Sequence, residues 1–213
     1  MSPEALEAHL RVSHPDTRQT MPLHWTEGGT RSPALPVAGI TWFEARAFCN
    51  WLAAQSATAV RLPSEAEWEG AARARPSDTF AFGATFDAAA CNSVEAHVRS
   101  VTPVGVFPAG DTTNRLADMA GNVGEWTATA FDDDLPYPYR AADGRDAPDT
   151  GRYPLRIVRG GGWKCDERDT RTACRYYVHV ASATRDVGLR IAISAAPSTS
   201  TAGDRSAGHD CTR

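Results

Sequence analysis

Two segments rich in glycine and tryptophan constrain this chain more than any other feature. Residues 121–126 read GNVGEW, and residues 159–163 read RGGGW. Neither segment has the period of a helix or a strand. Glycine lets a backbone turn tightly or pass close to another group, and tryptophan offers a large surface to pack on. We therefore expect a loop-rich domain whose order comes from buried aromatic side chains and fixed charges.

Capping motifs predict two helices. Thr41 and Glu44 form one capping box, and the helix that follows is expected to end near residues 53–56. Its helical spacing predicts a buried face made of Trp42, Ala45, Phe48, Cys49 and Leu52. Ser64 and Glu67 form a second capping box, which predicts a helix that runs through Ala72.

The remaining segments read as short strands and loops. We expect short strands at residues 36–40, 101–107 and 155–159, and one at 187–194 that buries its alternating apolar side chains on one face. Residues 131–153 are rich in Asp, Pro, Tyr and Gly and predict a long surface loop. Residues 3–12 have the pattern of a short amphipathic helix.

Two further motifs accompany the glycine segments in a fixed order. Residues 61–68 read RLPSEAEW, and residues 188–190 read GLR. Together the four motifs resemble the formylglycine-generating enzyme (sulfatase-modifying factor) family. The resemblance implies an α+β domain, the family's variant of the C-type lectin fold, with two helices, short and mostly antiparallel strands and long loops. We divide the chain into an N-terminal segment (1–35), this domain (36–194) and a polar tail (195–213) that we expect to be disordered.

Composition argues against several classes of function. The 213 residues suit one domain, and a net charge of −4 without a basic stripe argues against nucleic acid. The first residues lack the pattern of a signal peptide, and no apolar stretch is long enough to span a membrane, so we expect a cytoplasmic protein. Five scattered cysteines without CxxC spacing give neither a disulfide framework nor a zinc site.

An acidic, glycine-bent loop at residues 118–125 suggests calcium, which prefers carboxylate and carbonyl oxygens. The family resemblance implies a structural calcium site made of the Asp118 and Glu125 side chains and the Gly121 and Val123 carbonyls. The alternative is that Glu125 and Asn122 hydrogen-bond the turn internally, with Trp126 in the core. A second calcium site of the family would use Asn92, but no acidic partner follows it at the expected distance.

The segment after the RGGGW motif bears on catalysis. In oxidase members of the family, two cysteines five residues apart bind copper(I), a soft ion that prefers thiolate ligands. These members use copper and dioxygen to convert a peptide cysteine to formylglycine. Cys165 matches the first cysteine and Thr170 stands at the second, while Arg171 is retained as a substrate or oxyanion contact. Cys174 is the nearby replacement. The alternative is that both cysteines are ordinary packing or loop residues.

Other members of the wider family are non-haem iron sulfoxide synthases, whose iron ligands are histidines of a separate helical domain. The six histidines of this chain form no pair at helical i, i+4 spacing. An iron site therefore has little support in the sequence.

The same fold also serves as a display scaffold in variable proteins diversified by retroelements. Here the corresponding surface, residues 164–187, mixes charged and polar side chains with Tyr176, Tyr177 and His179. Tyrosines among short polar neighbours are good recognition residues. The two functional hypotheses are thus a copper-dependent oxidase and a non-catalytic module that binds a peptide or protein at this surface.

Overall fold

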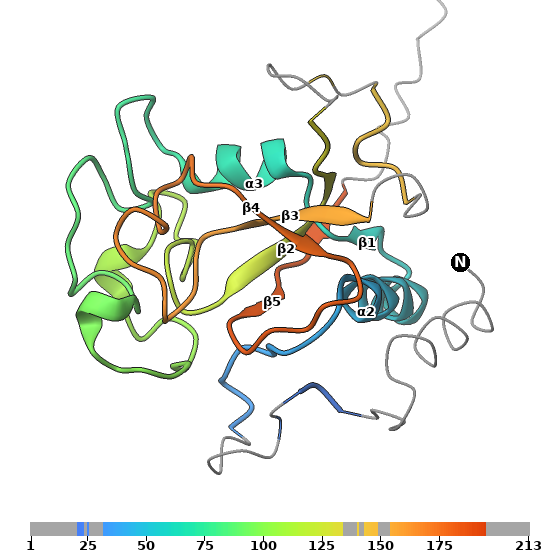
Figure 1. Ribbon diagram of the computed structural model, residues 1–213, viewed down its shortest axis with the longest axis horizontal. Helices are drawn as coiled ribbons and strands as arrows, with labels where there is room; N and C mark the ends of the chain where they lie inside the picture. The colour runs from blue at the N-terminus through green and yellow to red at the C-terminus, as the bar shows by residue number, and fades with distance from the viewer. Residues whose placement is uncertain are drawn as a thin grey trace, which may run out of the picture.

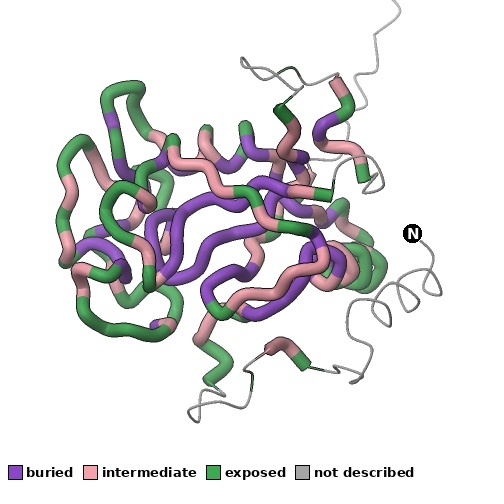
Figure 2. The backbone as a smooth tube through the Cα atoms, viewed as in Figure 1, coloured by how far each residue is buried: buried purple, intermediate pink, exposed green. Residues whose placement is uncertain are grey.

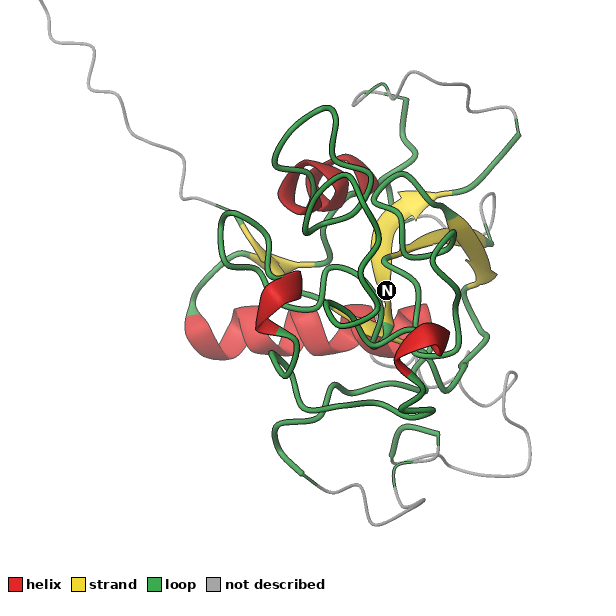
Figure 3. Ribbon diagram, turned by 90° about the vertical axis from the view of Figure 1, so that its left-hand side faces the viewer, coloured by secondary structure: helices red, strands yellow, loops and turns green. Residues whose placement is uncertain are grey.

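Loops make up most of the domain, with two helices and short strands between them (Figures 1 and 3). The computed structural model describes residues 21–23, 25, 32–133, 140, 143–148 and 154–194. The expected helix at 3–12 and the tail lie outside these residues. The elements follow the order α2 (Trp42–Ser56), β1 (Val60–Arg61), α3 (Glu65–Ala72), η2 (Val94–Ala96), η3 (Pro108–Gly110), β2 (Gly124–Ala130), β3 (Leu155–Arg159), β4 (Tyr176–His179), β5 (Val187–Leu189) and β6 (Ala192–Ile193).

The strands form one four-stranded sheet and one two-stranded sheet. The larger sheet has the order β4-β3-β2-β5, with β2–β3 and β3–β4 antiparallel and β2–β5 parallel. In the smaller sheet β1 pairs with β6 in an antiparallel manner. The long loops between α3 and β2 lie at one end of the molecule and α2 at the other (Figure 1). This arrangement confirms the predicted α+β fold with mostly antiparallel strands.

Both predicted capping boxes are present. The Thr41 hydroxyl accepts from the Glu44 amide, and the Glu44 carboxylate accepts from the Thr41 amide. Ser64 and Glu67 make the same two bonds at the start of α3. Each box satisfies two amides that a helix start would otherwise leave free, so both helices begin where the sequence predicts.

One core prediction on α2 is wrong. Phe48 is 44% exposed, while Phe43 is buried. Trp42, Ala45 and Cys49 do form the buried face, as expected. Phe48 packs against Trp51 at a ring-centroid distance of 5.8 Å on the outer side of the helix, and Trp51 is itself exposed.

Three buried tryptophans join the segments of the core. The Trp42 indole donates to the Thr127 carbonyl (2.9 Å), and the Trp126 indole donates to the Ile40 carbonyl (3.0 Å). Trp68, on the buried side of α3, belongs to a second apolar cluster with Met119. Buried residues follow the central strands β2 and β3, and exposed ones lie in the peripheral loops and on the outer side of α2 (Figure 2). Because each indole has both a packing surface and a polar partner, these residues fix the loops to the sheet.

Several strand predictions need correction. Residues 36–40 contribute a single bridge, Ala38 to Gly188, because Gly39 turns the chain at φ 74°. Residues 101–107 form turns, with the side chain of Val104 58% exposed. The predicted strand at 187–194 is two short strands in different sheets, separated at Arg190, so Ile193 is exposed.

The central strand β2 was missed because it lacks alternation. Six of its seven residues are buried, so both faces lie in the interior, and a strand of this kind does not alternate apolar and polar side chains. The predicted surface loop at 131–153 is irregular in its described parts. Arg145 within it is nevertheless buried, and its carbonyl accepts from the Ala130 amide (2.7 Å). Within the described ranges, no helix has the length and apolar character to cross a membrane.

Candidate functional site

The glycine turn after β3 sets the start of the surface formed by residues 164–187. Gly160 and Gly161 have φ values of 92° and 68°, which side chains rarely adopt. A β-carbon on Gly160 would lie 3.2 Å from the edge of the Trp68 ring, and one on Gly161 would lie 3.1 Å from the Asp169 carbonyl oxygen. The turn therefore lets the backbone pass directly against an aromatic ring, as the sequence suggests.

Arg159 holds the far part of this surface in place. Its guanidinium is fully buried and donates to the carbonyls of Thr172 and Cys174, the latter at 2.6 Å. It also binds Glu69 on α3 at 2.6 Å. A planar fork donor can satisfy several oxygens at once, so Arg159 ties the loop that follows the RGGGW motif to α3.

The structure brings both candidate cysteines close to one tyrosine. Tyr176 begins β4, and burial raises the pKa of its phenol, with Asp169 and the thiols of Cys165 and Cys174 adding to the effect. Burial likewise raises the pKa of Cys165. Both shifts favour the protonated forms, so at neutral pH Cys165 carries a thiol and Tyr176 a phenol. Cys174 lies two positions before Tyr176, just outside β4.

Thr170 and Arg171 take structural positions in the loop. Thr170, at the place of the family's second cysteine, is fully buried, and its hydroxyl donates to the Glu167 carbonyl (3.0 Å). Arg171 is exposed, and its Nε donates to the Arg168 carbonyl (2.7 Å). Within the described ranges, no hydrogen bond or ion pair joins Arg171 to either cysteine. The residues present thus do not supply the family's copper pair at 165 and 170, and Cys174 is the alternative thiol.

The carboxylate expected to bind calcium has protein partners. Glu125 is buried in β2, and its Oε1 and Oε2 accept from Arg190 at 2.7–3.0 Å. Its Oε2 also accepts from the indole of Trp68 (2.6 Å). Arg190 supplies the positive charge that a cation would bring, so Glu125 does not fit the ligand role and we derive no calcium chemistry from it. The sequence shows the GLR and GNVGEW motifs but not that Arg190 of the first pairs with Glu125 of the second.

The other expected calcium ligands lie in one hydrogen-bonded loop. Gly121 bridges to Asn92, and the Asn122 amide donates to the Asn92 carbonyl (2.8 Å). Asp118 accepts from the Gly105 amide at 3.0 Å and from the Asn122 side chain at 3.4 Å. Among the described residues, the buried Oδ1 of Asn92 has no hydrogen-bond donor, and no three His, Cys, Asp or Glu side chains are placed to share a metal. The calcium site stays a prediction of the family resemblance, and the partners of Glu125 favour the alternative of internal hydrogen bonding.

Three comparisons place the chain among known proteins. It is 29% identical over 192 residues to hercynine oxygenase of Mycolicibacterium thermoresistibile, a match that covers 81% of this chain and 41% of that protein. It is 32% identical over 139 residues to the inactive C-alpha-formylglycine-generating enzyme 2 of Bos taurus, covering 60% of this chain and 38% of that protein. The chain thus spans less than half the length of these curated relatives.

The fold is shared with variable protein 1 of Treponema denticola at a TM-score of 0.62 and 21% identity, over 74% of this chain and 70% of that structure. The model of the sulfatase-modifying factor enzyme 1-like domain matches residues 5–195, which begins upstream of the predicted boundary at residue 36. Because this match covers most of the sequence, the chain belongs to the sulfatase-modifying factor enzyme 1-like family.

Proposed function

We propose that the surface formed by residues 164–187 recognises a peptide or protein ligand and has lost the copper chemistry of the family's oxidases. The observation that carries this proposal is the position of Thr170. It is buried where the second copper-binding cysteine would stand, and its hydroxyl is bonded to the Glu167 carbonyl. A hydroxyl is a hard ligand and does not replace a thiolate for copper(I).

The exposed aromatic residues of this surface support a recognition role. Tyr177 on β4 is 56% exposed, and its ring stacks on Phe131 with centroids 4.1 Å apart. Stacking restricts the rotamers of Tyr177, so less side-chain entropy would be lost when a ligand packs on it. Tyrosine is also among the residues that contribute most to binding energy at interfaces.

The surface rests on a rigid support. Arg159 is buried beneath the loop, and Arg175 at the end of the loop binds both carboxylate oxygens of Glu65 on α3. Fixed loops of this kind favour affinity because they are ordered before the ligand binds. Two similar proteins agree with the proposal: one relative is named an inactive formylglycine-generating enzyme, and one structural neighbour is named a variable protein.

A peptide selection tests the proposal. Peptides from a random display library are selected on the protein, and their affinities are measured for wild type, Tyr177→Ala and Trp51→Ala. Trp51 is the matched control, an exposed aromatic residue on α2. We expect Tyr177→Ala to weaken the selected peptides at least about tenfold and Trp51→Ala to leave them unchanged. Selected peptides that bind Tyr177→Ala as tightly as the wild type, or a selection that enriches no peptide, would contradict a recognition surface here.

A second candidate function is oxidation of a peptide thiol with Cys165 and Cys174 as a shifted pair. The support for it is that both thiols contribute to the raised pKa of the Tyr176 phenol. Bound copper would supply redox chemistry with dioxygen, and Asp169 and Tyr176 would offer a hydrogen-bonding group beside the thiols. Its test is oxidation of a cysteine-containing peptide by the copper-loaded protein. Turnover that is abolished by Cys165→Ser and by Cys174→Ser would establish this function in place of simple recognition.

A further inference from the structure

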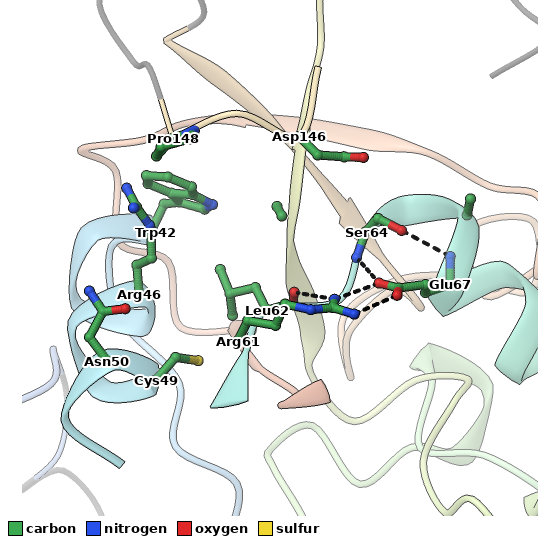
Figure 4. Close-up of a pocket in the computed structure, with 12 residues that line it drawn as sticks. Trp42, Arg46, Cys49, Asn50, Arg61, Leu62, Ser64, Glu67, Asp146 and Pro148 are labelled. Atoms are coloured by element: carbon green, nitrogen blue, oxygen red, sulfur yellow. Dashed lines mark hydrogen bonds and ion pairs between the residues drawn. The ribbon is translucent and has the colours of Figure 1, made fainter. Parts of the chain in front are cut away.

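A pocket of about 620 Å³ lies away from the surface formed by residues 164–187 and has no role in the proposals above (Figure 4). One side is formed by α2, with Trp42, Arg46 and Asn50, and the other by β1 and the start of α3. Its volume is within the range of small-molecule sites in proteins. Apolar residues make most of the wall: Trp42, Cys49, Leu62, Ala66, Ala128 and Pro148.

Arg46 is the unusual group of this pocket. Its guanidinium lies over the Trp42 ring, 5.1 Å from the ring centroid. Within the described part of the chain, no carboxylate pairs with it. The loss of water around it lowers the pKa of Arg46, and desolvation is the sole cause of that shift. A half-buried cation without a counter-ion is costly, so an anion that enters the pocket would be stabilised there.

The other charged groups of the pocket already have partners. Arg61 binds both carboxylate oxygens of Glu67 at 2.6 and 2.7 Å, as Figure 4 shows. Asp146 accepts from the Thr129 hydroxyl at 2.5 Å. Arg156 also lies over the Trp42 ring, 4.5 Å from its centroid, and it donates to backbone carbonyls. Because Arg61 is paired with Glu67, Arg46 is the cation without a carboxylate partner among the described residues that line this pocket.

These observations define the chemistry of a ligand. A guanidinium that stacks on a ring still presents its N–H edge, which matches the two oxygens of a carboxylate. A dianion such as phosphate would also face Glu67 and Asp146, so a single negative charge fits better. We propose that this pocket binds a small organic monocarboxylate, whose carboxylate pairs with Arg46 while its apolar body packs against Leu62 and Ala128.

The test uses 3-phenylpropionate, its neutral amide and inorganic phosphate as probes, with binding followed by calorimetry and by NMR of the full chain. The variants are Arg46→Gln, which removes the cation, and Arg46→Lys, which keeps the charge but removes the paired N–H donors of the guanidinium. Arg73→Gln is the matched control, because Arg73 is the C-cap residue of α3 and binds Glu69 outside this pocket. The NMR spectra also verify that each variant is folded.

We expect 3-phenylpropionate to bind the wild type and Arg73→Gln equally. Its affinity for Arg46→Gln should fall at least about tenfold, the loss typical of one charge-assisted hydrogen bond, and Arg46→Lys should be intermediate. The amide should bind the wild type correspondingly more weakly. The proposal is overturned if acid and amide bind alike, if Arg46→Gln binds as wild type, if phosphate binds more tightly than the carboxylate, or if no saturable binding of the carboxylate is seen.

Discussion

Arg190 and Glu125, from the end of β5 and from β2, form an ion pair at 2.7 Å in which both carboxylate oxygens accept from the guanidinium. The same arginine donates to the Ala117 carbonyl (2.8 Å), so it also fixes the loop before β2. This one side chain therefore connects the GLR motif to the GNVGEW motif. Two motifs that are far apart in the sequence thus meet in one ion pair.

Replacing Arg190 with Gln should lower the free energy of unfolding by about 2–4 kcal/mol, because Glu125 would keep its charge in a buried position. The estimate is below that for a fully buried pair, since 28% of the Arg190 side chain is exposed. Chemical denaturation measures the effect. Arg61→Gln breaks the exposed pair with Glu67 and serves as control, with an expected loss of about 0–1 kcal/mol. Equal losses in the two variants would contradict the role assigned to Arg190.

Calcium chelation is an independent test of the role of Glu125. Because Arg190 already neutralises Glu125, we expect the melting temperature of the wild type to be the same in EGTA and in millimolar calcium. Differential scanning calorimetry under both conditions gives the answer. A clear fall of the melting temperature in EGTA would show that a cation binds the loop at residues 118–125, as the family resemblance implies.

The pH dependence of stability should report on Glu67. Arg61 holds the pKa of Glu67 at about 2, against an ordinary value of 4.5, and the Ser64 amide adds to the effect. A lowered folded-state pKa stabilises the protein above the unfolded pKa, and this contribution is lost as pH falls. Glu67→Gln should therefore melt below the wild type at pH 7, and the difference should shrink between about pH 4.5 and 2.

Glu44→Gln is the matched control for this pH experiment, because it makes the same change in the capping box of α2. No arginine pairs with Glu44 among the described residues. At pH 7 the substitution Glu44→Gln should therefore lower the melting temperature less than Glu67→Gln does. A difference for Glu67→Gln that stays constant down to pH 2 would show that the ion pair with Arg61 is not its origin.

Two glycine substitutions of the same kind should have opposite effects. Gly160→Ala places a methyl group 3.2 Å from Trp68 at a φ of 92°, so we expect a loss of about 1–3 kcal/mol. Gly70→Ala lies on α3 with nothing within 4 Å, so we expect a gain of about 0.5–1 kcal/mol from helix propensity. Denaturation followed by tryptophan fluorescence compares them. A neutral Gly160→Ala would mean that the backbone does not need to approach Trp68 this closely.

The sequence predicted features that depend on local chemistry or on a full motif. Capping boxes placed both helices, and the four motifs placed the fold. It failed where burial on both faces removed the alternation, as in β2, and where one residue broke a strand, as at Arg190. The pairing of Arg190 with Glu125 depends on a contact between distant segments. No spacing rule in the sequence encodes such contacts.

The most direct test of the central claim is a copper(I) titration under reducing conditions, with a chromophoric chelator as competitor, on wild type, Cys165→Ser and Cys174→Ser. Because Thr170 occupies the position of the second thiolate, we predict no tight one-to-one binding that depends on Cys165. One equivalent of copper bound tightly by the wild type, and lost in both serine variants, would contradict the recognition account and establish the shifted thiol pair as a metal site.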